Sequence, residues 1–228
     1  MVYKIVHHRE GADELRSEFE ALHVVQAHCN ADRPRVFAIP RALAFFNPLN
    51  EEFFTFPESN AQLRQNLVPV LAADSFRNIG ISLPTYTMDR VHAIPAGVGT
   101  LIRSEYYPRR AQAYTVPYPS LCRLYFGKQL QNTGTFVNSN NFPIDVARYQ
   151  AILDSKGDSV PFLSVEEIAT GMGKILGRIH WTCGYDGRDI EFVMGGDGYS
   201  GVSYHVIDFN QVSAFIPEDN LYKFTIVR

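Results

Sequence analysis

This sequence has few cysteines, a small net charge and no long apolar run. Its 228 residues contain three cysteines, Cys29, Cys122 and Cys183, and no Cys-x-x-Cys pair. An odd number of widely spaced thiols disfavours a disulfide scaffold or a structural zinc site, and it predicts buried free cysteines in a reducing compartment. No stretch approaches ~18 consecutive apolar residues, and the N-terminus has no apolar signal segment. We therefore expect a cytoplasmic protein with no membrane partner.

The charge balance limits the partners that the chain can bind. Lysine and arginine total 21, and aspartate and glutamate total 24, which makes the formal net charge −3. This excludes a generally basic nucleic-acid binder and predicts no DNA partner, although it leaves room for a local basic patch. With 46% hydrophobic residues, the chain is large and apolar enough to fold as a single domain over residues 1–228.

The apolar patterning of the first two thirds predicts both strands and helices. A short strand is expected at Val2–Val6 and an amphipathic helix at Ala12–Ala27. Pro143 is expected to be the first residue of a second helix that ends near Leu153. The other expected strands in this part are Val36–Ile39, Leu43–Phe46, Tyr86–Val91, Gly99–Arg103 and Leu121–Phe126.

The last third has the strongest local signals. Ser164 and Glu167 form a capping box, which predicts a helix over Val165–Trp181. Two short apolar runs follow, Ile190–Met194 and Tyr204–Phe209, and a glycine-rich segment separates them. This pattern predicts a β-hairpin with a long tip.

Three acidic residues follow the long helix in an order typical of phosphotransferases. Asp186 lies in a loop, Glu191 comes five residues later, and Asp208 lies in the second apolar run. This order resembles that of protein kinases and aminoglycoside-type phosphotransferases, in which a catalytic Asp, a metal-binding Asn and a second metal-binding Asp flank a hairpin. The resemblance implies that Asp186 acts in catalysis and that Glu191 and Asp208 could hold Mg²⁺.

The N-terminal segment fits the same plan. Lys4 would be the strand lysine that binds nucleotide phosphates, and Glu18 or Glu20 on the following helix would be its ion-pair partner. The implied fold is α+β, a shortened protein-kinase/aminoglycoside-phosphotransferase-like two-lobe fold. Residues 1–92 would form a remnant N-lobe with a β-rich segment, and residues 93–228 would form a C-lobe with the catalytic-loop-like region.

Three departures from the kinase pattern argue against phosphate transfer. The glycine-rich strands that would precede Lys4 are missing because the chain begins at Met1, Glu191 replaces the catalytic-loop Asn, and only 20 residues follow Asp208. A site without a phosphate cradle would position and stabilise a transferring phosphoryl group poorly. Two alternatives stay open: a small-molecule phosphotransferase that uses ATP and Mg²⁺, and a non-catalytic pseudokinase-like binding protein.

A closer resemblance rests on several short motifs. They are Asn141-Phe142-Pro143, Met172-Gly173, Ile179-His180-Trp181, the run Asp186–Gly195, Ile207-Asp208-Phe209 and the run Arg123–Lys128. Together they are similar to a fungal family that has an uncharacterised domain and is often labelled zinc-finger protein, a label that these cysteines do not support. Part of that family consists of the fungal arginine-containing cyclodipeptide synthases. The resemblance implies an enzyme that takes arginine from arginyl-tRNA and joins it to a second amino acid from another aminoacyl-tRNA as a diketopiperazine.

The synthase interpretation assigns the acidic residues another role. Asp186, Asp189, Glu191 and Asp208 would crowd carboxylates into one pocket, where the planar guanidinium of the arginine substrate could pair with them. One of the expected catalytic residues Asp186, Glu191 and Asp208 would act as general base on the attacking α-amine. Under this interpretation the reaction needs no metal and no cofactor.

Neighbouring residues complete the expected site. The substrate-binding set is Asp189, Lys4, Glu18, Tyr185 and His180. His180 could orient Asp186 and Tyr185 could donate a hydrogen bond to an oxyanion, although each would also serve as a packing residue at the helix end. The tRNA would need positive charge beside aromatic rings, which the sequence offers at Arg103, Arg109, Arg110, Arg123 and Lys128.

Overall fold

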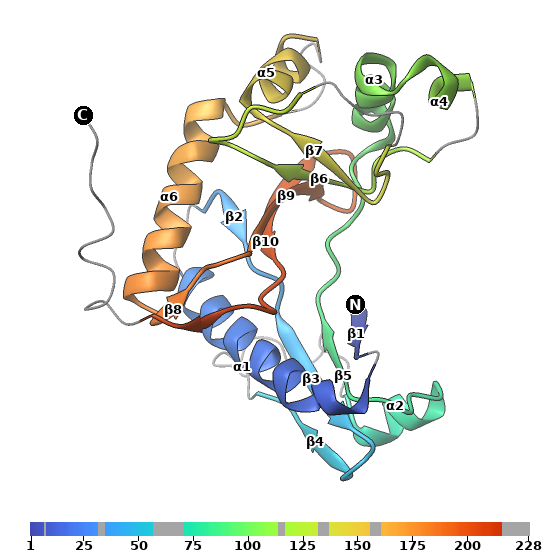
Figure 1. Cartoon of the computed structure of the whole chain (residues 1–228), viewed down its shortest axis with the longest axis vertical. Coiled ribbons are helices and arrows are strands. Elements are labelled where there is room, and N and C mark those ends of the chain that lie inside the picture. The colour runs from blue at the N-terminus through green and yellow to red at the C-terminus, as the bar shows by residue number, and fades with distance from the viewer. Residues whose placement is uncertain are drawn as a thin grey trace.

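The chain folds as a mixture of helices and strands around two main sheets (Figure 1). The computed structural model describes residues 1–6, 8–31, 35–56, 71–113, 117–131, 137–155 and 161–215. Its helices are η1 (Arg9–Gly11), α1 (Ala12–Cys29), α2 (Ala73–Asn78), α3 (Ala96–Tyr106), α4 (Arg109–Ala113), α5 (Val146–Ser155) and α6 (Val165–Trp181). Its strands are β1 (Val2–Ile5), β2 (Phe37–Ala38), β3 (Ala42–Asn47), β4 (Glu52–Phe54), β5 (Thr85–Met88), β6 (Leu121–Leu124), β7 (Asn141–Ile144), β8 (Tyr185–Asp186), β9 (Glu191–Gly196), β10 (Val202–Ile207) and β11 (Ser213–Ala214). The expected α+β class is confirmed.

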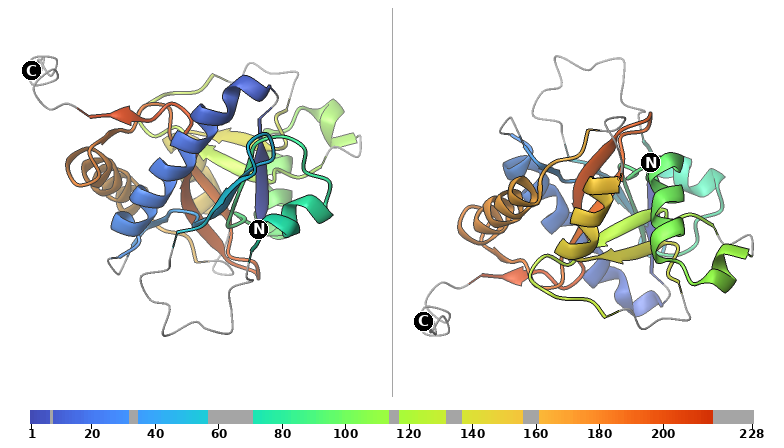
Figure 2. Two further views of the ribbon diagram at one scale, coloured as in Figure 1. Left: turned by 90° about the horizontal axis from the view of Figure 1, so that it is seen from below. Right: turned by 90° about the horizontal axis from the view of Figure 1, so that it is seen from above.

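The first sheet carries the N-terminal strand at its edge. Its order is β1-β5-β3-β4, its neighbouring strands are antiparallel, and Lys4 lies opposite Tyr86 in the pairing of β1 with β5. Helix α1 lies against this sheet (Figure 2). The ring of Phe19 on α1 packs at 6.0 Å from the ring of Phe45 and at 5.5 Å from the ring of Tyr86, and all three are buried. Burial of these aromatic rings holds the helix on the sheet.

The second sheet is built on the hairpin that the sequence predicts. Strands β9 and β10 pair antiparallel, and the full order is β2-β10-β9-β6-β7. Strand β2, which follows α1 in the chain, pairs in parallel with β10 and so belongs to this second sheet. Phe19 on α1 and Tyr204 on β10 lie in one buried cluster. The two sheets therefore share one hydrophobic core.

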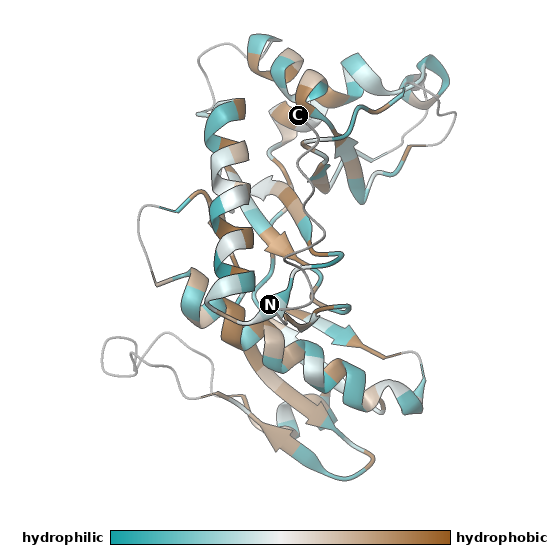
Figure 3. Ribbon diagram, turned by 60° about the vertical axis from the view of Figure 1, so that its left-hand side comes forward, coloured by the Kyte–Doolittle hydropathy of each residue, from teal (hydrophilic) through white to brown (hydrophobic). Residues whose placement is uncertain are grey.

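Helix α6 begins at the predicted capping box. The Ser164 Oγ accepts a hydrogen bond from the backbone N–H of Glu167 at 3.2 Å, and the Glu167 carboxylate accepts one from the backbone N–H of Ser164 at 2.7 Å. In Figure 3 the helices alternate between hydrophilic and hydrophobic colours, as expected for elements with one buried face. No helix in the described part of the chain is long and apolar enough to cross a membrane.

Two predicted elements were wrong. The expected strand Gly99–Arg103 lies inside helix α3, where Val98 and Ile102 are four residues apart and both buried. A short apolar run is compatible with a strand or a helix. Here the buried residues have the four-residue spacing of a helix. The helix expected to start at Pro143 begins at Val146 instead. Pro143 lies in β7 at the sheet edge, and edge strands tolerate a residue without a backbone N–H.

Gly171 and Gly173 on α6 form a matched pair for testing how closely this helix packs. A Cβ at Gly171 would lie 2.7 Å from the Cβ of Val36, whereas a Cβ at Gly173 would meet no atom within 4 Å. We predict that Gly171→Ala lowers the free energy of unfolding by about 1–3 kcal/mol through overpacking. Gly173→Ala should raise it by about 0.5–1 kcal/mol because alanine favours the helix. Denaturant unfolding followed by circular dichroism checks both, and equal effects would contradict the close approach of α6 to Val36.

Candidate functional site

A partly buried ion-pair cluster joins three distant parts of the chain. The Lys4 Nζ on β1 donates to Glu18 Oε1 on α1 at 2.6 Å and to Asp208 Oδ1, just after β10, at 3.2 Å. The predicted ion pair between Lys4 and the following helix is therefore formed, and Glu18 is the partner. Glu20, the other candidate, pairs instead with Arg16 at 3.0 Å on the outer face of α1. We call Lys4, Glu18 and Asp208 the Lys4 cluster.

Glu18 is the buried member of the Lys4 cluster. Its side chain is 5% exposed, whereas those of Lys4 and Asp208 are each 35% exposed. The Tyr86 hydroxyl donates a second hydrogen bond to Glu18 Oε1 at 2.9 Å. Removing a carboxylate from water is costly unless donors replace the lost hydration. Lys4 and Tyr86 supply those donors, and the open side of the cluster is the one formed by Lys4 and Asp208.

The charges of the cluster alter the titration of its members. Burial disfavours the charged form of Lys4, but the hydrogen bonds and negative charges of Glu18 and Asp208 outweigh it and raise the pKa of the Lys4 ammonium. Burial first, and then the charge of Glu18, raises the pKa of the Tyr86 hydroxyl. With one cation between two carboxylates, the cluster has surplus negative charge.

Asp208 has an unusual backbone conformation. Its φ of 63° lies in the left-handed region, which residues other than glycine adopt at a cost of about 1–3 kcal/mol. Phe209 beside it is buried in the core. The Asp208 carboxylate contacts Lys4 at the end of the hairpin, and backbone strain of this kind gathers at functional sites.

Asp186 lies in a second, separate charge group. It belongs to β8, which pairs with β11. Its Oδ1 is 3.9 Å from the Nε2 of His180, and its Oδ2 is 3.5 Å from a terminal nitrogen of Arg188. The His180 ring stacks on the ring of Phe215 at 4.9 Å. At 3.9 Å the contact of His180 with Asp186 is too long for a hydrogen bond, so the orienting role of His180 stays a prediction. Arg188 is a second charged neighbour of Asp186 that sequence reasoning did not assign.

Tyr185 precedes Asp186 and is half-buried. Burial, together with the negative charges of Glu20 and Cys183, raises the pKa of its hydroxyl. A neutral phenol can donate a hydrogen bond, so the predicted donor role is chemically available. Tyr185 also packs against the main core, which is the packing role that the sequence left open.

Glu191 is the member of the acidic set whose surroundings differ most from expectation. The Arg123 side chain on β6 forms a short ion pair with its carboxylate, and the Asn141 Nδ2 on β7 donates to Glu191 Oε2 at 2.7 Å. Its side chain is 15% exposed. Glu191 therefore already has two donors from the neighbouring strands.

The four acidic residues of the expected carboxylate pocket have different surroundings. Asp208 pairs with Lys4, Asp186 lies by His180 and Arg188, and Glu191 pairs with Arg123, while Asp189 is exposed. In the ranges that the structure describes, no group of three His, Cys, Asp or Glu side chains could hold a metal ion. The pairing of β9 with β10 sets Glu191 opposite Ile207, the residue before Asp208, and the two carboxylates nevertheless pair with cations on different strands, Arg123 on β6 and Lys4 on β1.

The basic residues proposed to contact tRNA fall into two groups. Arg123 and Lys128 both lie over the ring of Tyr125, at 5.0 and 5.7 Å from its centroid. Arg103 on α3 lies 5.7 Å from the ring centroid of Tyr118 and donates to the backbone carbonyl of Gln112 at 2.8 Å. The neighbouring Arg109 and Arg110 are exposed on α4. The expected pairing of cations with aromatic rings is present, and its use for tRNA stays a prediction.

Comparison with known proteins adds no relative: no family model, no curated protein and no solved structure matches this chain.

His205 on β10 is a partly buried titratable residue that sequence reasoning missed. The Ser203 hydroxyl donates to the Gly196 carbonyl at 2.7 Å and lies 2.9 Å from the Nε2 of His205. Having used its own hydrogen, the hydroxyl accepts one from Nε2, so His205 is the tautomer protonated at Nε2. Its Nδ1 is buried without a partner. The pKa of His205 is lowered to about 4, mainly by burial and then by the positive charges of Arg35 and His92. The negative charge of Asp89 acts in the opposite direction.

The lowered pKa of His205 predicts a loss of stability in mild acid. The pKa of His205 is about 4 in the folded chain and 6.5 in the unfolded chain. At pH values between these two, the unfolded state binds a proton that the folded state does not. Stability should therefore fall by about 2 kcal/mol from pH 7 to pH 5 through this residue. Urea unfolding at the two pH values measures this loss. In His205→Gln the free energy of unfolding should fall by about 2 kcal/mol less over the same pH range. A variant with the same pH dependence as the wild type would contradict the assignment.

Proposed function

We propose that the Lys4 cluster is the phosphate-binding centre of a nucleotide- and magnesium-dependent phosphotransferase. The proposal rests on two contacts of Lys4, which lies on a strand. Lys4 contacts Glu18 on the following helix and Asp208 after a hairpin. Protein kinases use a lysine, a glutamate and an aspartate from the same three kinds of element to hold nucleotide phosphates and Mg²⁺.

The order of the elements supports the same proposal. Strand β1, helix α1, strand β3 and strand β5 come first, and helix α6 then leads through Asp186 to the β9–β10 hairpin. This is the chain order of the kinase core around its nucleotide site. We therefore propose a shortened kinase-like two-lobe arrangement, with residues 89–95 leading from β5 to α3 as the connection between lobes.

The residues present fit Mg²⁺ through one carboxylate. Asp208 is partly exposed, and Mg²⁺ is commonly held by one or two carboxylates together with substrate phosphates. Glu191, the second ligand expected from the sequence, is engaged by Arg123 and Asn141. When bound, Mg²⁺ would neutralise phosphate charge. Lys4 would bind the phosphates, Glu18 would orient Lys4, and Asp186 would accept the proton of the acceptor hydroxyl.

Nucleotide binding through the cluster predicts a rise in melting temperature. With Mg·ATP at about 100 times its Kd, the wild-type melting temperature should rise by about 5–10 °C. Asp208→Asn should abolish the rise, because the amide replaces the metal-binding carboxylate at a partly exposed position and keeps its size. Lys4→Met should also abolish it. Differential scanning fluorimetry with and without Mg·ATP measures the shift.

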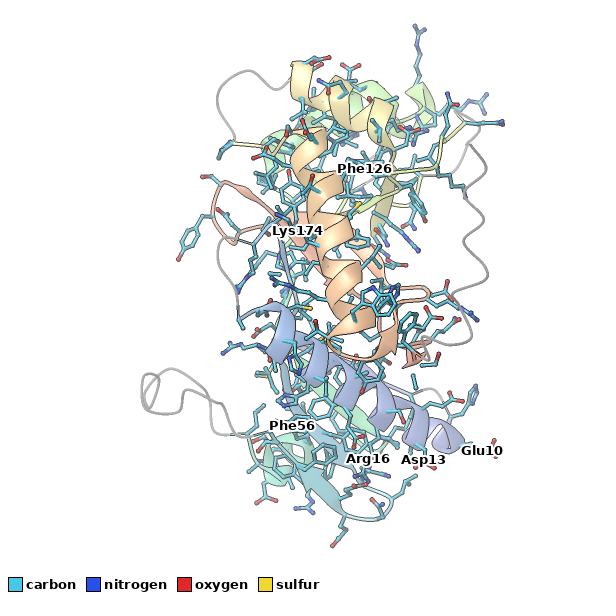
Figure 4. The ribbon with its side chains drawn as sticks, turned by 90° about the vertical axis from the view of Figure 1, so that its left-hand side faces the viewer. Glu10, Asp13, Arg16, Phe56, Phe126 and Lys174 are labelled. Atoms are coloured by element: carbon cyan, nitrogen blue, oxygen red, sulfur yellow. The ribbon has the colours of Figure 1, made fainter. Side chains whose placement is uncertain are left out.

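Arg16→Met is the matched control for the nucleotide experiment. Arg16 pairs with Glu20 at 3.0 Å and with Glu52 at 2.6 Å on the outer face of α1 (Figure 4), so this change also removes a cation from two carboxylates, away from the Lys4 cluster. It should keep the full shift. No shift in the wild type at millimolar Mg·ATP, or a normal shift in Asp208→Asn, would rule out the proposed nucleotide site.

The position of Glu191 favours a second candidate, the arginine-containing cyclodipeptide synthase. Pairing with Arg123 removes Glu191 from the metal-binding set that phosphoryl transfer uses in kinases. Asp186 and the partly exposed Asp208 then have the roles that the family resemblance implies: general base for the attacking α-amine and partner for the guanidinium of arginine. The stacks of Arg123 and Lys128 on Tyr125 offer a surface for the tRNA backbone and bases.

The synthase candidate predicts a new metabolite in cells that express the chain. Cultures of bacteria and of yeast should accumulate a compound with the mass of an arginine-containing diketopiperazine. Asp186→Ala should abolish it, whereas Asp154→Ala, which removes an exposed carboxylate on α5, should not. Mass spectrometry of culture extracts against an empty vector detects the product. Its absence from both hosts with soluble, folded protein would exclude this activity, and absence of nucleotide binding as well would favour a non-catalytic binding protein.

A further inference from the structure

An apolar groove runs between helices α5 and α6 and one end of the second sheet. Two adjoining hollows of about 390 and 440 Å³ form it, and Gly127, Val146 and Val165 line both of them. Every residue around the first hollow is apolar or glycine, including Leu124 on β6 and Phe192 on β9. Small-molecule sites have volumes of about 300–1,000 Å³ and mostly apolar walls, so the groove is large enough to hold a ligand.

Helix α6 forms one wall of the groove with a stripe of apolar side chains. Val165, Ala169, Met172 and Leu176 lie three or four residues apart, so they share one side of the helix. Phe126 lies beside this stripe (Figure 4). Ala169 is exposed, and Val165 and Leu176 are partly exposed. The rest of the described chain therefore covers the stripe only in part, and apolar surface of this kind marks binding sites.

The second hollow gives the groove a polar end. Lys128 and Gln150 line it together with Asp145. Asp145 is 3% exposed, and its two carboxylate oxygens accept backbone N–H groups of Leu130 at 2.7 Å and of Arg148 at 2.9 Å. Its charge is therefore already stabilised by hydrogen bonds. Lys128 is exposed, so its ammonium is the charge that a ligand in the groove can approach.

We propose that this groove binds a fatty acid, with the alkyl chain in the apolar hollow and the carboxylate paired with Lys128. The alkyl chain would cover the exposed stripe of α6 and remove apolar surface from water. The groove extends from Leu176 on α6 to Gln150 on α5, which suits a linear chain with one polar end. The Lys4 cluster contributes no residue to either hollow, so the proposal is independent of the proposed reaction.

Isothermal titration calorimetry of the full chain with sodium decanoate tests the proposal. The titration is made below the micelle concentration and at about pH 8, where the carboxylate is ionised. One decanoate should bind per chain. From octanoate to decanoate the affinity should rise about tenfold, because two more methylene groups are buried. Decylammonium, which has the same chain and the opposite charge, should bind several-fold more weakly than decanoate because Lys128 repels it.

Two pairs of variants locate the ligand in the groove. Ala169→Phe fills the apolar hollow and should abolish decanoate binding, whereas Thr170→Phe alters an exposed neighbour outside the groove and should not. Lys128→Met should weaken decanoate binding about 2- to 5-fold and narrow its advantage over decylammonium. Lys174→Met is the control, because Lys174 is exposed and two residues from both Met172 and Leu176, on the other side of α6 (Figure 4). Circular dichroism checks that each variant is folded.

Three results would overturn the proposal. They are no saturable binding of decanoate at millimolar concentration, decanoate binding that folded Ala169→Phe retains in full, and decylammonium that binds the wild type as tightly as decanoate. The first would show that the groove is no fatty-acid site, the second that the ligand lies elsewhere, and the third that Lys128 does not select the head group. None of them would alter the expected response to Mg·ATP, so the two proposals fail separately.

Discussion

Glu18 places a carboxylate inside the protein, and the arrangement around it depends on meeting that constraint. An ionisable group that is 5% exposed needs donors close by. Lys4 on β1 and Tyr86 on β5 supply them, and Lys4 reaches on to Asp208 after β10. The buried Glu18 therefore links α1 to two strands of the first sheet, and its partner Lys4 links that sheet to the end of the hairpin in the second.

The β9–β10 hairpin distributes the acidic residues between two cations. Glu191 at the start of β9 faces Arg123 on β6, and Asp208 after β10 faces Lys4 on β1. Glu191 is thus paired with a cation of its own sheet, and Asp208 with a cation on the edge strand of the other sheet. These pairings limit the chemistry of the site. One partly exposed carboxylate beside a lysine suits a phosphate group with its cation or a guanidinium, but it does not provide the paired carboxylates of a two-metal centre.

The ends of α1 and α6 form a second junction in the molecule. Helix α1 contacts α6, and His180 and Trp181 at the end of α6 pack on the ring of Phe215. Asp186 follows within a few residues, so its position depends on how α6 ends. The two junctions, at the Lys4 cluster and at these helix ends, both lie on α1. That helix therefore couples the parts of the chain that any reaction at this site would use.

The features that local sequence predicted are those whose causes are local. The capping box of Ser164 and Glu167 stabilises the start of α6 through neighbours in the chain, and the period of apolar residues on β9 and β10 defines the hairpin. The Lys4–Glu18 pair was predictable because a strand and the helix after it lie close together in this kind of α+β order. The same reasoning failed for Gly99–Arg103, where a short apolar run fits a strand or a helix equally well and burial against the rest of the core decided for α3.

The tertiary structure alone decided which groups meet across long separations. Nothing in the sequence indicates that Glu191 faces Arg123 and Asn141, because that depends on which strand lies beside β9 and on the face to which each side chain points. The sequence likewise did not show that the Nδ1 atom of His205 would be buried without a hydrogen-bond partner. Local patterns determine which elements form, since their energies come from near neighbours. Charge partners and buried polar atoms depend on packing between elements, which the folded core as a whole determines.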